Sequence, residues 1–267
     1  MNFCYNELMT LLFLFVLGAI FGSFIGALTW RWPKEISVLD GRSRCPGCNV
    51  KINWYDNIPI FSYLMLHGKC RHCHKKIALR YPLIELSLAL LFPLAYLLLP
   101  RISKNVGWLL SLGTPAAIFI ILVTVTVLVA IFIIDARHQY IPDSLVFAIF
   151  LTTLFAFLVT DNARLFHYLA AGAGASVFLL SLNLVTFGKG MGLGDVKLAF
   201  ALGTILGFPL VLVWVFGAFI LGSIVGVAAL LAKRAKLKQK IAFGPFLISS
   251  FGITLVFGYE ILNLLGF

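Results

Sequence analysis

Two aspartates lie where apolar segments meet polar ones, and these residues are the best placed in the chain to do chemistry. Asp135 follows the run VLVAIFII, and Asp195 lies in the segment GMGLGDVKLAF. We expect both at the cytosolic ends of membrane spans, at similar depth. Two carboxylates brought together cannot both ionise easily, so one keeps a proton and the pair supplies an acid and a base. Such a pair can activate water against a peptide carbonyl and protonate the leaving amine.

Glycines surround Asp195, at positions 190, 192 and 194. Such a segment is poor helix but allows close approach of the backbone, and irregular backbone at membrane depth is tolerated where it lines a watered cavity. We therefore expect Gly192 and Gly194 to support the site. Asp143 is expected to cap a helix or to position the pair. Taken alone, each aspartate has the alternative of an interfacial residue, and Asp143 and Asp195 are well placed to favour a helix N-terminus.

The elements that hold these residues are predicted to be membrane-spanning helices. The chain has 267 residues, of which 61% are hydrophobic and 12% are charged, and its mean hydropathy is +1.02. Soluble domains carry about 25% charged residues, so a soluble globular enzyme and a disordered chain are both excluded. A spanning helix needs about 20 mostly apolar residues. We expect an all-α polytopic membrane protein with about eight spans, at 8–30, 83–100, 115–134, 143–160, 165–187, 196–208, 209–232 and 243–265.

The cationic residues concentrate in alternate loops. Of the 21 Lys and Arg residues, 18 fall in the loops at 31–82, 135–142, 188–197 and 233–242. Loops rich in Lys and Arg face the cytosol, so we expect both termini on the opposite side. The formal charge of +11 is then a signal of orientation in the lipid bilayer, and it implies no nucleic acid partner.

The loop at 31–82 is large enough to form a domain, and it carries four of the five cysteines. Two C-x2-C pairs at this separation match a four-thiolate zinc site. Two disulfides or a redox pair are the alternative, which is disfavoured because the loop is expected in the reducing cytosol. A closed four-ligand site has no open position, so we predict structural Zn²⁺. The predicted ligands are Cys45, Cys48, Cys70 and Cys73.

These expectations divide the chain into three parts. Residues 1–30 form the first transmembrane helix, and residues 31–82 form a cytosolic, zinc-ribbon-like insert. Residues 83–267 form a seven-helix membrane core that contains both aspartates.

The motifs together resemble the bacterial type IV prepilin peptidases, a family of GxGD-type intramembrane aspartyl proteases. The GxGD sequence precedes a predicted span and is paired with an upstream Asp, and the cysteine spacing agrees as well. The family's catalytic pair corresponds to Asp135 and Asp195. The resemblance covers nearly the whole chain through GSFIGALTWRWP at 22–33, SRCPGCNVKINWYDNIPIFSYLMLHGKCRHC at 43–73, RYPLIELSLALLF at 80–92 and FGPFL at 243–247.

This resemblance implies an enzyme of the bacterial inner membrane that cleaves the short, basic leader from prepilins and type II secretion pseudopilins. The cut falls after a Gly, on the cytosolic side. Many members then methylate the new N-terminal residue, usually Phe, with S-adenosylmethionine. We therefore expect a bifunctional peptidase and N-methyltransferase, and the methyl donor is inferred from the resemblance alone.

Two residues near the N-terminal spans bear on methyl transfer. The family typically reads GSFLN near the first span, where this chain has Gly26 in place of the Asn. Gly18, Gly22 and Gly26 then form two G-x-x-x-G spacings, which suit close helix packing. Glu85 is expected either to pair with Arg80 or another cation, or to serve methyl transfer.

Two other classes of protein are open on the residues alone. A proton-coupled transporter with a cytosolic zinc-ribbon module also uses membrane acids and broken helices, but transporter sites lie near the bilayer midplane. Both aspartates are instead expected at the cytosolic ends of spans. A non-enzymatic membrane scaffold would need neither carboxylate.

Overall fold

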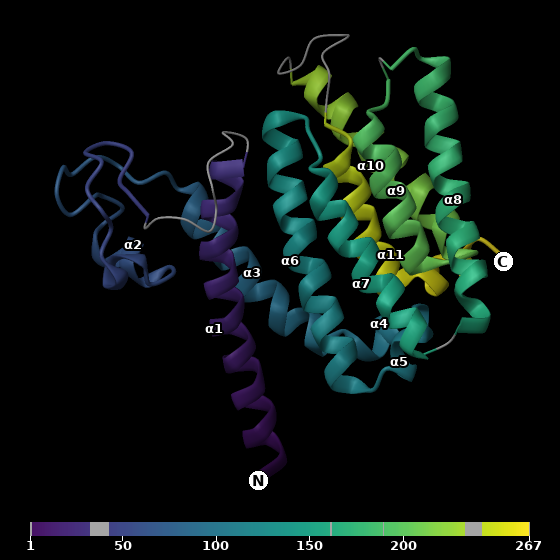
Figure 1. Ribbon diagram of the computed structural model, residues 1–267, viewed down its shortest axis with the longest axis horizontal. Helices are drawn as coiled ribbons and strands as arrows, with labels where there is room; N and C mark the ends of the chain where they lie inside the picture. The colour runs from purple at the N-terminus through teal and green to yellow at the C-terminus, as the bar shows by residue number, and fades with distance from the viewer. Residues whose placement is uncertain (1, 33–42, 161, 189, 233–241, 267) are drawn as a thin grey trace. The chain divides into compact units, whose positions relative to one another are not determined.

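The computed structural model describes residues 2–32, 43–160, 162–188, 190–232 and 242–266, and these residues form helices and connecting loops without a named strand (Figure 1). The chain divides into two compact units, Met1–Leu97 and Leu98–Phe267. The first is called the N-terminal unit below, and the second the C-terminal unit. The basic run at 233–240 lies outside the described residues.

The N-terminal unit contains two long helices and the cysteine-rich insert between them. In chain order its helices are α1 (Asn2–Arg31), the 3₁₀ helix η2 (Trp54–Asn57), α2 (Phe61–Met65) and α3 (Arg80–Leu97). Helix α3 therefore lies in the same compact unit as α1 and the insert, whereas the sequence had grouped it with the later helices.

Helices α1 and α3 pack closely because glycines on α1 present bare backbone to α3. A Cβ at Gly22 would lie 2.5 Å from the Cα of Glu85, and one at Gly18 would overlap the α3 backbone. Gly26 continues this face, where a Cβ would lie 3.3 Å from the ring of Tyr81. The close packing predicted from the two G-x-x-x-G spacings is confirmed at Gly18 and Gly22.

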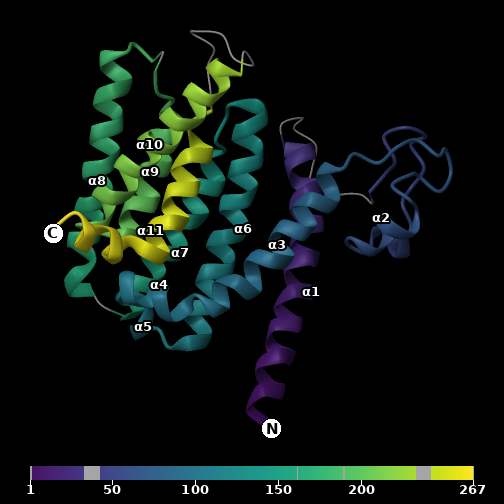
Figure 2. The ribbon, with the colours of Figure 1, turned by 180° about the vertical axis from the view of Figure 1, so that it is seen from behind.

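The C-terminal unit is a bundle in which long helices run side by side (Figures 1 and 2). The connection after α3, which the sequence left unassigned, folds into two short helices. The helices of this unit are α4 (Leu99–Asn105), α5 (Trp108–Ser111), α6 (Thr114–His138), α7 (Asp143–Thr160), α8 (Asn162–Val185), α9 (Leu193–Leu206), α10 (Leu210–Leu231) and α11 (Gly244–Leu264).

Seven helices among the described residues are long and apolar enough to cross a membrane, namely α1, α3, α6, α7, α8, α10 and α11. The prediction of an all-α, multi-pass protein is thereby confirmed. The remaining predicted span, at 196–208, corresponds to α9, which has 14 residues. At about 1.5 Å of rise per residue, such a helix is shorter than a hydrocarbon core of about 30 Å.

Helix α9 is enclosed by its neighbours along most of its length, since nearly every residue after its first turn is buried. It crosses α8 at close range: a Cβ at Gly203 would lie 2.8 Å from the Cα of Gly172. On another side, the rings of Phe200 and Phe150 of α7 are 5.2 Å apart. An apolar helix without a polar face belongs in the interior of a bundle, and this enclosure fixes the position of Asp195 at its start.

The crossing of α8 and α9 generates a stability prediction. A Cβ at Gly172 would lie 2.5 Å from the carbonyl oxygen of Phe200, so Gly172→Ala must push the helices apart. We expect a loss of about 1–3 kcal/mol in the free energy of unfolding, the usual cost of overpacking. Thermal unfolding of the purified protein in detergent, followed by circular dichroism, measures the change.

Gly174→Ala is the matched control on the same helix, because a Cβ at Gly174 meets nothing within 4 Å. It should leave stability unchanged or raise it slightly, since Ala favours helix over Gly by up to about 1 kcal/mol. Equal unfolding midpoints for the two variants would contradict the close crossing.

Candidate functional site

The two aspartates that the sequence singled out come together in the C-terminal unit. Asp135 lies in the last turn of α6 and is 5% exposed, and Asp195 lies in the first turn of α9 and is 8% exposed. Their carboxylates are close enough to interact electrostatically. Helices α7 and α11 each pack against both α6 and α9. The expectation that these distant residues share one location is therefore met by the fold.

The carboxylate of Asp135 is held by the beginning of α11. Its Oδ2 accepts a hydrogen bond of 3.0 Å from the backbone N–H of Gly244, and this contact is buried. A Cβ at position 244 would lie 2.5 Å from the same oxygen. Glycine is thus required here because any side chain would displace the carboxylate.

The carboxylate of Asp195 is held by the backbone that precedes α9. Its Oδ2 accepts a hydrogen bond of 3.1 Å from the N–H of Gly192, the N-cap residue of the helix. A Cβ at Gly192 would lie 3.1 Å from that oxygen. The other oxygen, Oδ1, is buried and makes no hydrogen bond with the described residues. An unpaired buried oxygen costs about 1–3 kcal/mol, and it leaves Asp195 able to bind a proton or a donor.

The side chain of Ile141 lies next to glycines that neighbour both carboxylates. This buried residue precedes α7. A Cβ at Gly194 would lie 3.0 Å from the Cβ of Ile141, and one at Gly244 would lie 3.3 Å from its Cδ1. The predicted supporting glycines therefore act differently: Gly192 donates a hydrogen bond, and Gly194 leaves room for Ile141.

The glycine-rich loop before α9 is tied to the end of α8. The side chain of Asn183 donates a hydrogen bond to the carbonyl of Met191, and the N–H of Gly190 donates one of 3.1 Å to the hydroxyl of Thr186. These bonds satisfy backbone groups that the irregular loop would otherwise leave unpaired. They hold the loop that carries the Gly192 donor.

Asp143 lies at the beginning of α7 and takes no part in the hydrogen bonds that hold the two buried carboxylates. It forms an ion pair of 2.7 Å with Lys197 of α9, and both side chains are about half exposed. This contact connects α7 with the turn of α9 that carries Asp195. It is consistent with the positioning role expected of Asp143.

Reasoning from the sequence did not identify the roles of Gly244, Ile141 and Asn183 in holding the site. Gly244 belongs to the FGPFL segment that contributed to the family resemblance, but no role followed from that motif alone. All three residues meet the aspartates or their loop only through the folding of the bundle.

The four cysteines of the insert form a cluster that fits one metal ion. Their sulfur atoms all lie within 4.8 Å of one another, and the Sγ atoms of Cys45 and Cys73 are 3.8 Å apart. Tetrahedral zinc with Zn–S bonds of about 2.3 Å separates its sulfurs by about this distance, whereas a disulfide bond is about 2.05 Å long. The cysteines are free in this structure and meet the requirement for a four-thiolate site: Cys45, Cys48, Cys70 and Cys73.

Each cysteine pair lies in a knuckle with the same backbone pattern. The N–H of Cys45 donates to a carbonyl five residues ahead at 3.0 Å, and the N–H of Cys70 does the same at 2.9 Å. Asn49 and His74, which follow the second cysteine of each pair, both have positive φ, at 57° and 53°. The repeated geometry turns both thiols of each pair toward one centre.

Hydrogen bonds favour the thiolate form of one cysteine of the cluster. Burial raises the pKa of the Cys45 thiol, but hydrogen bonds from the backbone at Gly47 and Cys48 and from the Cys70 and Cys48 side chains together lower it to about 7, whereas the neighbouring thiols raise the pKa of Cys48 to about 11. The thiolate is the form that binds metals.

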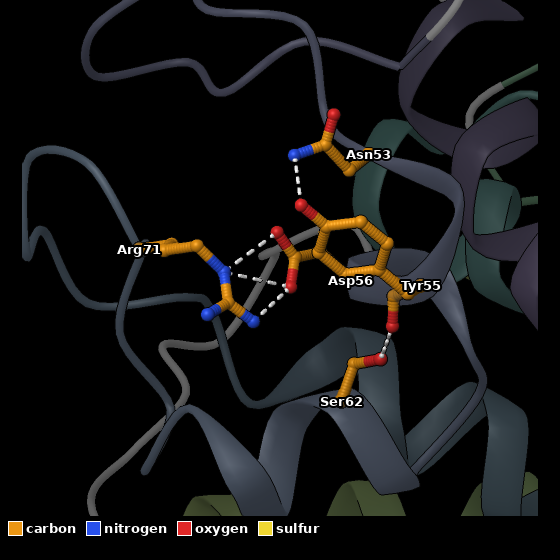
Figure 3. A network of polar contacts seen from close by, with 5 residues as sticks. All are labelled: Asn53, Tyr55, Asp56, Ser62 and Arg71. Atoms are coloured by element: carbon orange, nitrogen blue, oxygen red, sulfur yellow. Dashed lines mark hydrogen bonds and ion pairs between the residues drawn. The ribbon is translucent and has the colours of Figure 1, made fainter.

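A polar network holds the segment between the knuckles (Figure 3). Arg71 of the second knuckle binds Asp56 through two nitrogens, with the shortest contact at 2.6 Å. The guanidinium also lies 5.5 Å from the ring centre of Tyr55. Ser62 donates a hydrogen bond of 2.7 Å to the carbonyl of Tyr55. The network fixes the start of α2 relative to the second knuckle.

A cavity of about 720 Å³ lies in the N-terminal unit, lined by the end of α1, the start of α3 and both knuckles. Glu85 of α3 lines it, and its Oε2 accepts a hydrogen bond of 2.7 Å from the N–H of Ile60. The ion pair considered for Glu85 and Arg80 is not formed. Arg80 instead donates to the hydroxyl of Tyr81 at 3.0 Å and lies over its ring.

Comparison with known protein families gives a match in each unit. Residues 16–99 match the bacterial peptidase A24 N-terminal domain, and residues 121–227 match the type IV leader peptidase family. The first match falls almost entirely on the N-terminal unit, and the second lies within the C-terminal unit.

Several similar proteins carry a common name. A prepilin leader peptidase/N-methyltransferase of Vibrio cholerae is 32% identical over 265 residues, covering 92% of this chain and 96% of the relative. Proteins with the same name from Neisseria gonorrhoeae and Pseudomonas aeruginosa are 35% and 32% identical, and they cover 88% and 92% of this chain. No solved structure matches the chain.

The contact between Gly244 and Asp135 generates a second prediction. Gly244→Ala should move the Asp135 carboxylate, because the added methyl group and Oδ2 cannot occupy the same space. We expect about 1–3 kcal/mol of destabilisation, measured by thermal unfolding. Gly252→Ala on the same helix is the control, since a Cβ there meets nothing within 4 Å. A Gly244→Ala protein as stable as this control would contradict the close approach of the Asp135 carboxylate to position 244.

Proposed function

The chain belongs to the type IV leader peptidase family, and from this membership we propose that it removes the leader from prepilins and then N-methylates the new N-terminus. It is a multi-pass protein of the bacterial inner membrane. The observation that carries the peptidase assignment is the pair of buried, electrostatically coupled carboxylates on α6 and α9.

Asp135 and Asp195 act as the catalytic acid and base of an aspartic endopeptidase. Two neighbouring carboxylates hold one proton between them. The ionised carboxylate takes a proton from water as the water oxygen attacks the scissile carbonyl carbon, and the protonated carboxylate supplies the proton that the leaving amine needs. The unpaired Oδ1 of Asp195 is the atom at which we assign the resting proton.

The backbone donors keep both carboxylates in position during this cycle. The N–H groups of Gly244 and Gly192 each bind the Oδ2 atom of one aspartate, so the two Oδ1 atoms are the ones available for proton transfer. Asp143 supports the arrangement through Lys197, which lies one turn or less from Asp195.

The substrates are the basic leaders of type IV prepilins and type II secretion pseudopilins, cut after Gly on the cytosolic side. The cationic loops support the cytosolic side, because the ends of α6 and α9 that carry the aspartates adjoin loops of the Lys-rich and Arg-rich set. The transporter alternative gains no support from the relatives from Vibrio cholerae, Neisseria gonorrhoeae and Pseudomonas aeruginosa, which are named as peptidases and methyltransferases.

We assign Zn²⁺ to the four-cysteine cluster, where it has a structural role. The four sulfurs fill a tetrahedral coordination sphere, so no position is left for substrate or water. The insert is small, and small domains commonly need a metal or another crosslink to fold.

N-methylation uses S-adenosylmethionine as the methyl donor, and the cavity of the N-terminal unit fits a group of that kind. Its volume of about 720 Å³ lies within the range of about 300–1,000 Å³ typical of small-molecule sites. Tyr63, Tyr81 and Trp54 supply aromatic surface for a heterocyclic base or a cation. Glu85 supplies a negative charge. When bound there, the donor supplies the methyl group.

Asp135→Asn and Asp195→Asn should each lower cleavage of a purified prepilin by about 10²–10⁴-fold, because an amide cannot exchange the proton in acid–base catalysis. Mass spectrometry of the substrate measures cleavage. Both variants should still methylate a synthetic pilin peptide that already begins with the mature Phe. Glu260→Gln, an exposed acidic position on α11, is the control. Normal cleavage by either Asn variant would remove that aspartate from the catalytic pair.

Elemental analysis should find about one zinc ion per chain in protein purified under reducing conditions. Cys73→Ser should lower the zinc content and make the insert more sensitive to protease, because one of four ligands is lost. Cys4→Ser, which changes the cysteine outside the cluster, should keep the full zinc content. Metal-free protein with an intact insert would contradict the assignment.

A further inference from the structure

The cavity of the N-terminal unit contains one acidic side chain whose charge is not matched by a cation in the described part of the chain. Asp56 and Glu85 are the acidic residues that line the cavity, and its lining also includes the cationic residues Arg31, Arg44, Lys51, Arg71, Lys75, Lys76 and Arg80. Asp56 is bound by Arg71 through two nitrogens. Glu85 has no ion pair with any described residue, and Arg80, the nearest cation in sequence, is bound to Tyr81. Glu85 is half-buried, where an unmatched carboxylate is costly unless a ligand compensates it.

The structure holds the Glu85 carboxylate in one position. Its Oε2 accepts the N–H of Ile60 at 2.7 Å, and the side chain of Ser23 on α1 provides a further hydrogen bond. An ionised carboxylate has about four acceptor sites on its two oxygens. These two contacts therefore orient the group and leave capacity for a cationic ligand in the cavity.

The Ile60 donor depends on strained backbone. Ile60 has φ 62° and ψ −52°, and the N–H of Phe61 bonds to the carbonyl of Pro59, which closes a γ-turn around it. This turn is rare, and positive φ is unfavourable for a β-branched residue. Such strain persists where surrounding contacts enforce it and is concentrated at functional sites. Here it directs an N–H group at the Glu85 carboxylate.

The chemistry of the second activity identifies a suitable ligand. Leader cleavage releases a pilin with a new α-amino group, which is an ammonium ion near neutral pH. Methyl transfer requires the neutral amine, so the nitrogen must first give up a proton. Its lone pair then forms the N–CH₃ bond while the carbon–sulfur bond of the donor breaks, and the bonding electron pair stays on sulfur.

We propose that Glu85 binds the new α-ammonium group of the cleaved pilin in this cavity and accepts its proton as the amine is methylated. The proposal deepens the proposed function and rests on it, since it assigns a residue to the methylation half of the reaction. Glu85 is thereby a catalytic residue of the N-terminal unit, distinct from the aspartates of the C-terminal unit.

The competing explanation is that Glu85 only tethers the insert to α3 through Ile60. Glu85→Gln separates the two roles, because the amide oxygen can still accept the Ile60 N–H while the charge and the proton acceptor are lost. The assay uses the full-length protein in detergent, S-adenosylmethionine and a synthetic pilin peptide that begins with Phe. Glu260→Gln is the matched control.

We expect Glu85→Gln to lower methylation of the peptide by about 10²-fold or more, as general-base removal does. Cleavage of prepilin, zinc content and binding of radiolabelled S-adenosylmethionine in equilibrium dialysis should match the unmodified protein. Without the methyl donor, the peptide should bind more weakly to the variant by isothermal titration calorimetry. An N-acetylated peptide should bind both proteins equally.

Normal methylation by Glu85→Gln would overturn the proposal, and so would loss of S-adenosylmethionine binding, which would make Glu85 a ligand of the donor. A tether alone predicts unchanged methylation, cleavage and zinc content in Glu85→Gln, because the amide oxygen still accepts the Ile60 N–H. A second measurement uses only the unmodified protein. A peptide that lacks the α-amino group should compete for the peptide site at least about 10-fold more weakly than the peptide that carries it, because a charge-assisted contact is lost. Equal competition would also overturn the proposal. Unmodified protein that neither cleaves nor methylates would instead refute the proposed function.

Discussion

The C-terminal unit is organised around two carboxylates that must be kept together out of water. Removing a carboxylate from water is costly, and a second one nearby adds to the cost. The bundle offsets this with backbone donors at two helix starts: Gly244 is the first residue of α11, and Gly192 is the N-cap of α9. The first N–H groups of a helix have no partner within it, and they carry partial positive charge. Each aspartate therefore accepts a hydrogen bond from an N–H group at a helix start, which would otherwise have no partner within its own helix.

This arrangement explains why glycine occupies both donor positions. A side chain at position 244 would collide with the Asp135 carboxylate, and one at position 192 would crowd that of Asp195. The φ angle of Gly192 is −81°, which other residues adopt readily, so space rather than backbone conformation sets the requirement there. The start of α9 at Leu193 follows from the same need, since the glycine-rich loop must end where Asp195 lies near Asp135.

Much of this could be read from the sequence, because the signals are local. Asp135, Asp195 and the glycines between 190 and 194 stand out against an apolar background, and the paired cysteines have a spacing with one dominant interpretation. The enclosure of α9 by the bundle could not be read, because an apolar run of about 13 residues that is buried in protein has the same hydropathy as a short span. The partners of the carboxylates could not be read either. Gly244 reaches Asp135 only through the packing of α11 on α6, and nothing in the segment FGPFL encodes that contact.

Glu85 illustrates the same limit in the N-terminal unit. From the sequence Glu85 was expected either to pair with a cation or to serve methyl transfer, and the fold gives it a backbone N–H from a strained turn in the insert as its partner. The insert is too small to position that turn by a hydrophobic core, so the cysteine cluster and the Asp56–Arg71 pair must hold it instead. In the function proposed here, a closed metal site that takes no part in chemistry still controls methyl transfer, because the knuckle side of the cavity and the donor to Glu85 both belong to the segment that it fixes. In the proposed mechanism the cysteines and Glu85 serve methyl transfer, and leader cleavage depends on a separate set of contacts around Asp135 and Asp195.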